Sequence, residues 1–140
     1  MHLSKALLLA LTLMVGTDAF ANCAKRDLYG FWHVISLGSS DGVGSVCIIA
    51  LNALGKVKSS SSCELFSDTS AERTAFDLDP SSSLTVNRQC HVSGGLGEAG
   101  RPLLAIDGQM SREGEYIQGT LEADAPDDVG SDVFIAIKMK

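Results

Sequence analysis

Aromatic residues and positive charges are scarce in this chain. Its 140 residues include one Trp and 6% aromatic residues, and 11 Lys and Arg stand against 17 Asp and Glu, for a net charge of −6. A surface with this balance repels phosphate backbones and anionic lipid, so neither nucleic acid nor a membrane surface is an expected partner. The composition leaves proteins and small molecules as the partners to consider.

No apolar run is as long as the roughly 20 residues that a helix needs to cross a bilayer. The run from Ala6 to Val15 instead follows a cation, Lys5, and precedes the small-residue end Ala19-Phe20-Ala21. These are the three parts of a secretory signal, so residues 1–21 are predicted to be a cleaved signal peptide and the mature chain to begin at Asn22. Residues 22–140 are short enough for a single domain.

Close cysteine pairs of the C-x-x-C type, which zinc sites use, are absent. The four cysteines, Cys23, Cys47, Cys63 and Cys90, all lie in the predicted mature chain. Disulfides persist in periplasmic or extracellular compartments, so two disulfides are the expected use of these residues. An acylated Cys23, as in a bacterial lipoprotein, is the alternative fate of the first cysteine, but Asn22 fits poorly in front of it.

No segment after residue 21 keeps a helical period for three turns. Short runs rich in β-branched and aromatic residues are separated by Gly, Pro, Asp and Ser, a pattern typical of antiparallel sheets. The prediction is an all-β fold, a small up-and-down antiparallel β-barrel of about seven to eight strands, with a β-sandwich as the alternative. The predicted strands span residues 31–37, 44–52, 73–78, 84–92, 103–110, 116–123 and 133–139, and residues 56–63 return from a hairpin.

That hairpin predicts how the cysteines pair. If the chain turns at Gly55, residues that face each other have numbers that sum to about 110, as Cys47 and Cys63 do. Opposed residues in an antiparallel pair come within disulfide range. Cys23 and Cys90 then pair by elimination, although a one-residue bulge would change the register.

Motifs for catalysis and metal binding find little support. His33 and His91 each lie in a predicted strand outside any recognisable nucleophile or metal motif, where a structural role is more common. No S-x-x-K pair is present to activate a serine. The acidic stretch from Asp124 to Asp132 is the one candidate calcium site, but its spacing differs from the D-x-D-x-D-G loop.

The segment from Cys23 to Trp32, with Gly30-Phe31-Trp32 after Leu28, resembles the opening of lipocalin-like β-barrels. This group includes the avidins and the small periplasmic inhibitors of bacterial metalloproteases. The resemblance extends to Asn52-Ala-Leu-Gly55, which is similar to the Asn-x-x-Gly at the end of the second avidin strand, and so covers about 40 residues. It implies that Gly30 and Trp32 form a motif that closes one end of a barrel. Avidins line their site with several tryptophans, so biotin is not implied for a chain with one.

These observations favour an exported, non-enzymatic β-barrel without a cofactor, which binds a protein, such as a protease, or a small apolar ligand. A structural or adhesive module of the cell envelope is one alternative. A hydrolase whose site is assembled from distant residues is the other.

Overall fold

The computed structural model describes residues 22–38, 43–67, 73–97, 104–123 and 131–140. It confirms the all-β prediction, because the only helix in these residues is a short 3-10 turn, η1 (Lys25–Leu28). Nine strands follow: β1 (Gly30–Leu37), β2 (Val43–Leu51), β3 (Ser62–Ser67), β4 (Arg73–Asp77), β5 (Ser83–Val86), β6 (His91–Leu96), β7 (Leu104–Met110), β8 (Tyr116–Ala123) and β9 (Ser131–Lys138).

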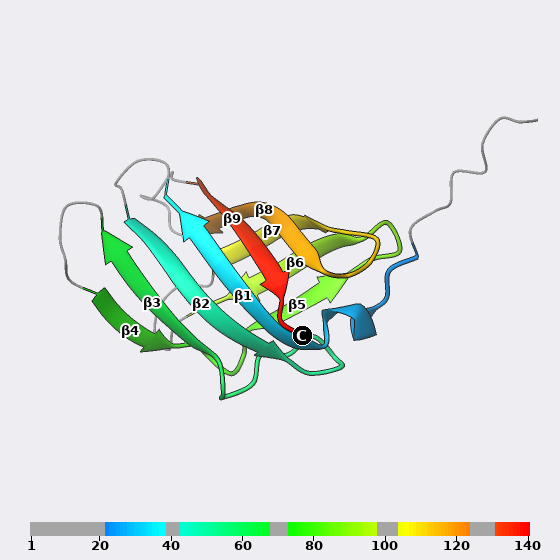
Figure 1. Cartoon of the computed structure of the whole chain (residues 1–140), viewed down its shortest axis with the longest axis horizontal. Helices are drawn as coiled ribbons and strands as arrows, with labels where there is room; N and C mark the ends of the chain where they lie inside the picture. Colours follow the sequence, from blue (N-terminus) through cyan, green and yellow to red (C-terminus); the bar gives the residue numbers. More distant parts are fainter. Residues whose placement is uncertain (1–21, 39–42, 68–72, 98–103, 124–130) are drawn as a thin grey trace, which may run out of the picture.

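The strands form one antiparallel sheet in the order β4-β3-β2-β1-β9-β8-β7-β6-β5, which curls into a half-barrel (Figure 1). Within the described residues, its edge strands β4 and β5 do not pair with each other. Lys56 bridges to Ser83 on β5 and its neighbour Val57 bridges to Leu51 on β2. The connection between β2 and β3 thus joins two distant strands of the sheet.

One predicted strand, residues 84–92, is wrong as a single element, because it is β5, a turn and the start of β6. The carboxamide of Asn87 accepts hydrogen bonds from the backbone N–H groups of Gln89, at 2.9 Å, and of His91, at 3.0 Å. Cys90 completes the turn with φ of 64°. Asparagine commonly starts turns of this kind with hydrogen bonds from its own side chain. These local bonds favour a turn here, although the surrounding β-branched residues favour a continuous strand.

The hairpin predicted at Gly55 is present with a longer connection than expected. The return strand β3 begins at Ser62 and runs to Ser67, beyond the predicted end. The hydroxyl of Ser61 accepts a hydrogen bond from the N–H of Ala50 at 2.9 Å, in the place of a backbone carbonyl of a continuous strand. Cys47 nevertheless faces Cys63, as the sum of 110 predicts.

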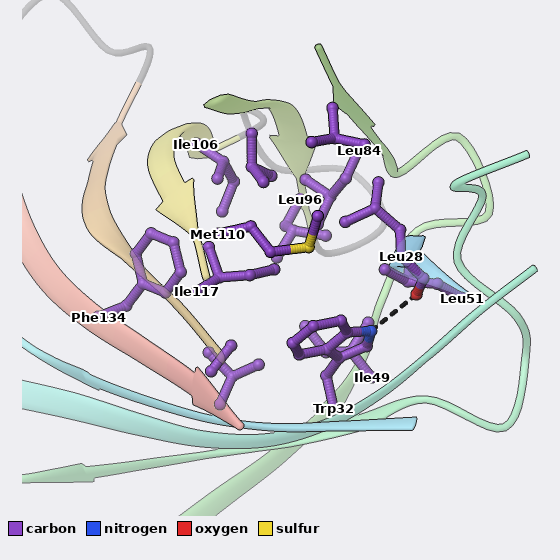
Figure 2. Packing of buried hydrophobic residues seen from close by; sticks show 14 of the residues in the cluster. Leu28, Trp32, Ile49, Leu51, Leu84, Leu96, Ile106, Met110, Ile117 and Phe134 are labelled. Carbon is purple, nitrogen blue, oxygen red and sulfur yellow. Dashed lines mark hydrogen bonds between the residues drawn. The ribbon is translucent and has the colours of Figure 1, made fainter. Parts of the chain in front are cut away.

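The core fills the concave side of the sheet and is closed at one end by η1 (Figure 2). Leu28 points into the core with no exposed surface, above Trp32 on β1. The indole Nε1 of Trp32 donates a hydrogen bond of 2.7 Å to the carbonyl oxygen of Leu28. This bond lets a large aromatic ring be buried without an unpaired donor.

Candidate functional site

The interior of the half-barrel is nearly filled. The cavity inside it, lined by Trp32, Val92, Ile106 and Phe134 among others, has a volume of about 20 Å³. That is room for roughly one water molecule, whereas ligand pockets have volumes of about 300–1,000 Å³. The part of the core that the structure describes therefore offers no space for an apolar ligand.

The convex side of the sheet, in contrast, carries large apolar side chains in adjacent strands. On β1 the residues that alternate with the core row are Phe31, His33, Ile35 and Leu37, and all four are exposed. The facing residues of β9 are also apolar, since Ile137 pairs with His33, Ile135 with Ile35 and Val133 with Leu37. We call the following set the outer apolar face: Phe31, Ile35, Leu37, Ile48, Tyr116, Val133, Ile135 and Ile137.

The register makes this face continuous. Ile48 of β2 lies opposite His33, and Tyr116 of β8 lies opposite Ile137, so four neighbouring strands contribute. Its members are 37% to 59% exposed. A shallow hollow of about 540 Å³ crosses it, where Ile35 and Ile135 meet the polar side chains of Gln118 and Thr120. Contiguous exposed apolar surface with a polar border is typical of a protein interaction site.

The two histidines predicted to be structural both lie on the outside of the sheet. His33 is an exposed polar residue within the outer apolar face. The Nε2 atom of His91 lies 2.9 Å from Oδ1 of Asp107 on the neighbouring strand β7. The nearest hydroxyl along β6, that of Ser93, is bonded to Thr85 at 3.2 Å. His91 and Asp107 therefore form a cross-strand surface pair, and no hydroxyl of the described residues is hydrogen-bonded to this histidine.

The motif Gly30 and Trp32 lies at the end of the sheet that η1 covers. Gly30 has φ of 129°, which allows the chain to pass from η1 into β1. Trp32 packs under Leu28, and the Nζ atom of Lys138 lies 5.3 Å from the centre of its ring. That amine also donates a hydrogen bond of 2.7 Å to the carbonyl oxygen of Asp27, which attaches β9 to η1.

The cysteines form two disulfides with the pairing that the hairpin register predicts. Cys47 is bonded to Cys63 across β2 and β3, and Cys23 is bonded to Cys90. The second bond attaches the segment before η1 to the turn between β5 and β6. No cysteine of the described chain is free.

The candidate calcium site cannot be placed, because residues 124–130 lie outside the described residues. Among the residues that are described, no group of three or more His, Cys, Asp or Glu could hold a metal ion. Residues 38–42 match the pattern G-x-S-x-G of hydrolase nucleophile elbows. In hydrolases this motif joins a strand to a helix, whereas here it joins the antiparallel strands β1 and β2, and residues 39–42 are not described.

No protein-family model, curated protein or solved structure matches the chain. Among the described residues, no helix has the length and apolar character needed to cross a membrane. The sequence patterns did not predict the outer apolar face, although Phe31, Ile35 and Leu37 lie on one side of the alternating strand 31–37. From the sequence alone, these apolar residues could equally face the core. The structure shows that they face outward, because Trp32 and Val34 on the other side of the strand are the buried residues.

Proposed function

We propose that this chain is an exported, non-enzymatic binding module that attaches to a protein partner through its outer apolar face. The observation that carries the proposal is the continuity of exposed apolar side chains over β2, β1, β9 and β8. Leaving this much apolar surface in water is costly, and covering it with a partner recovers roughly 25 cal/mol per Å² of apolar surface.

The other readings receive less support. The cavity of about 20 Å³ gives no support to a small apolar ligand inside the sheet. A protease inhibitor that inserts its N-terminal arm is also poorly supported, since cleavage after Ala21 leaves only Asn22 ahead of the tethered Cys23. A structural or adhesive module would pair with other chains through an edge strand such as β4. This strand is short and has a charged residue at each end, Arg73 and Asp77, and such charges discourage edge-to-edge pairing.

A photo-crosslinking amino acid at position 135 tests the proposal. The variant is expressed in the native host, irradiated, and analysed by mass spectrometry after purification under denaturing conditions. We expect one predominant protein adduct from position 135. The control places the same amino acid at Thr85, an exposed position on β5 away from the outer apolar face, and should give no such adduct.

A second variant tests whether the adduct from position 135 reflects binding of the partner rather than chance proximity. In Ile35→Lys, a charged amine enters the middle of the outer apolar face, and the adduct from position 135 should fall at least tenfold because an interface centre tolerates an unpaired charge poorly. Equal adducts from positions 135 and 85, or an adduct that survives Ile35→Lys in a folded chain, would contradict the proposal.

A further inference from the structure

The positive charges of this acidic chain are concentrated at the end of the half-barrel that η1 closes. We define this capped end as the five segments that contact one another there: residues 23–29, 52–58, 87–90, 111–115 and 138–140. They carry eight of the ten Lys and Arg of the predicted mature chain, namely Lys25, Arg26, Lys56, Lys58, Arg88, Arg112, Lys138 and Lys140.

Specific contacts hold these segments together. A Cβ atom added at Gly55 would lie 3.6 Å from Leu28, and one added at Gly114 would lie 3.7 Å from Asp27. The Nζ atom of Lys58 lies 5.5 Å from the centre of the Tyr29 ring. The Cys23–Cys90 disulfide attaches residues 87–90, and the hydrogen bond from Lys138 to Asp27 attaches residues 138–140. Figure 1 shows η1, these turns and the C-terminus at the same end of the sheet.

The negative charges at the capped end are fewer. Asp27, Glu113 and Glu115 are the only acidic residues of the five segments, so the eight cations leave a local net charge of +5. Counting Asp77 at the end of β4 and Asp79 in the connection to β5 still leaves +3. Glu115 pairs with Lys140 at 3.5 Å, and the Asp27 carboxylate accepts a hydrogen bond from the N–H of Ala24 at 2.7 Å.

The net charge of −6 is the sum of a positive capped end and a strongly negative remainder. The rest of the mature chain has two cations and 13 acidic residues, a net of −11. Glu122 lies near the end of β8 and Asp132 near the start of β9, so both lie at the end of the sheet away from η1, and these eight-residue strands each span about 26 Å. That length is about three times the Debye length of roughly 8 Å at physiological ionic strength. Repulsion from the far end is therefore largely screened at the capped end.

Exposed apolar side chains lie among these cations. Leu54 is 66% exposed, the highest fraction of any large apolar residue that the structure describes, and Tyr29 is 55% exposed. The carboxamide oxygen of Asn52 accepts hydrogen bonds from the N–H groups of Leu54, at 2.9 Å, and Lys56, at 3.0 Å. The turn thus holds a leucine at its tip with a lysine two residues on.

We infer that the capped end docks on the surface of an anionic lipid bilayer. A charge of +3 to +5 complements phosphate headgroups, and Leu54 and Tyr29 match the boundary between headgroups and acyl chains. These cations belong to five separate segments around η1, and an extended anionic surface is the ligand that suits cations spread in this way. This inference rests on export of the chain but not on the outer apolar face, which none of Tyr29, Leu54 and Lys56 belongs to.

Flotation with lipid vesicles tests the inference. The exported chain, with both disulfides intact, is mixed with vesicles of phosphatidylcholine alone or of phosphatidylcholine with phosphatidylglycerol. Binding should appear only with the anionic vesicles and should weaken as salt is added. Lys56→Ala should lower the partition coefficient about fivefold, as expected for one cation near an anionic surface. Leu54→Ser should also lower it, at any salt concentration.

The matched control is Arg73→Ala, which removes the same charge from a side chain that is 68% exposed on the edge strand β4. It should leave the partition coefficient unchanged within about twofold, because this cation lies outside the capped end. Absence of binding to anionic vesicles at low salt, equal binding to neutral vesicles, or equal effects of Lys56→Ala and Arg73→Ala would each overturn the inference. The crosslinking result at position 135 would stand in all three cases.

Discussion

At the scale of single residues, Trp32 has the clearest structural role. The sequence singles it out as the only tryptophan, in a Gly-x-Trp motif, but it cannot show what the indole contacts. The structure places the ring at 1% exposure beneath η1, with its N–H bonded to the carbonyl oxygen of Leu28. One side chain therefore holds the end-closing turn to the first strand.

Replacing this side chain tests that role. Trp32→Phe keeps an aromatic ring but leaves the buried carbonyl of Leu28 without its donor, and we expect the free energy of unfolding to fall by about 1–3 kcal/mol. Urea denaturation followed by circular dichroism measures it. The control, Phe31→Leu on the neighbouring exposed position, should change it by less than about 0.5 kcal/mol. Similar effects from both variants would mean that the indole bond contributes little.

At the scale of elements, periodicity located most strands to within two residues. Residues 116–123 are β8 as predicted, and residues 73–78 differ from β4 by one residue. The errors arose where a side chain competes with the sheet for backbone hydrogen bonds. Asn87 interrupts the run at 84–92, and Ser61 delays the start of β3. Such contacts depend on which groups the fold brings together, so periodicity cannot detect them.

The Cys47–Cys63 disulfide lies between two of these elements, β2 and β3. It encloses a short loop, with a sequence separation of 16, and should contribute about 3 kcal/mol by restricting the unfolded chain. We expect the double variant Cys47→Ser/Cys63→Ser to lower the melting temperature by more than about 10 °C, on the scale of about 4–8 °C per kcal/mol for small domains. Differential scanning calorimetry measures the change.

The second disulfide provides the comparison. Cys23→Ser/Cys90→Ser opens a longer loop, with a sequence separation of 67, and should cost about 4 kcal/mol. A smaller effect from the longer loop would show that local packing outweighs chain entropy here. Non-reducing peptide mapping checks the pairing itself, and a peptide that links Cys47 to Cys90 would contradict the register of β2 and β3.

At the scale of the whole molecule, the sequence predicted the fold class and the disulfides but neither surface. Composition reports a net charge of −6, and only the folded chain separates a cationic end from an acidic remainder. Likewise, the apolar row of β1 is recognisable in the sequence, but its neighbours on β9 are about 100 residues away. Both proposed surfaces form only where segments that are distant in the sequence become neighbours in the fold. Composition contains no information about that proximity.

Export determines which N-terminus the whole molecule has. Ala19-Phe20-Ala21 predicts that N-terminal sequencing of the exported chain begins at Asn22. The disulfide supports this over acylation, since an acylated Cys23 would leave Cys90 without its partner in the core. Thiol labelling of the denatured, unreduced protein should accordingly find no free thiol, and four after reduction. A chain that begins at Met1, or one that begins at a lipid-modified Cys23 and exposes one reactive thiol, would show that the export prediction is wrong.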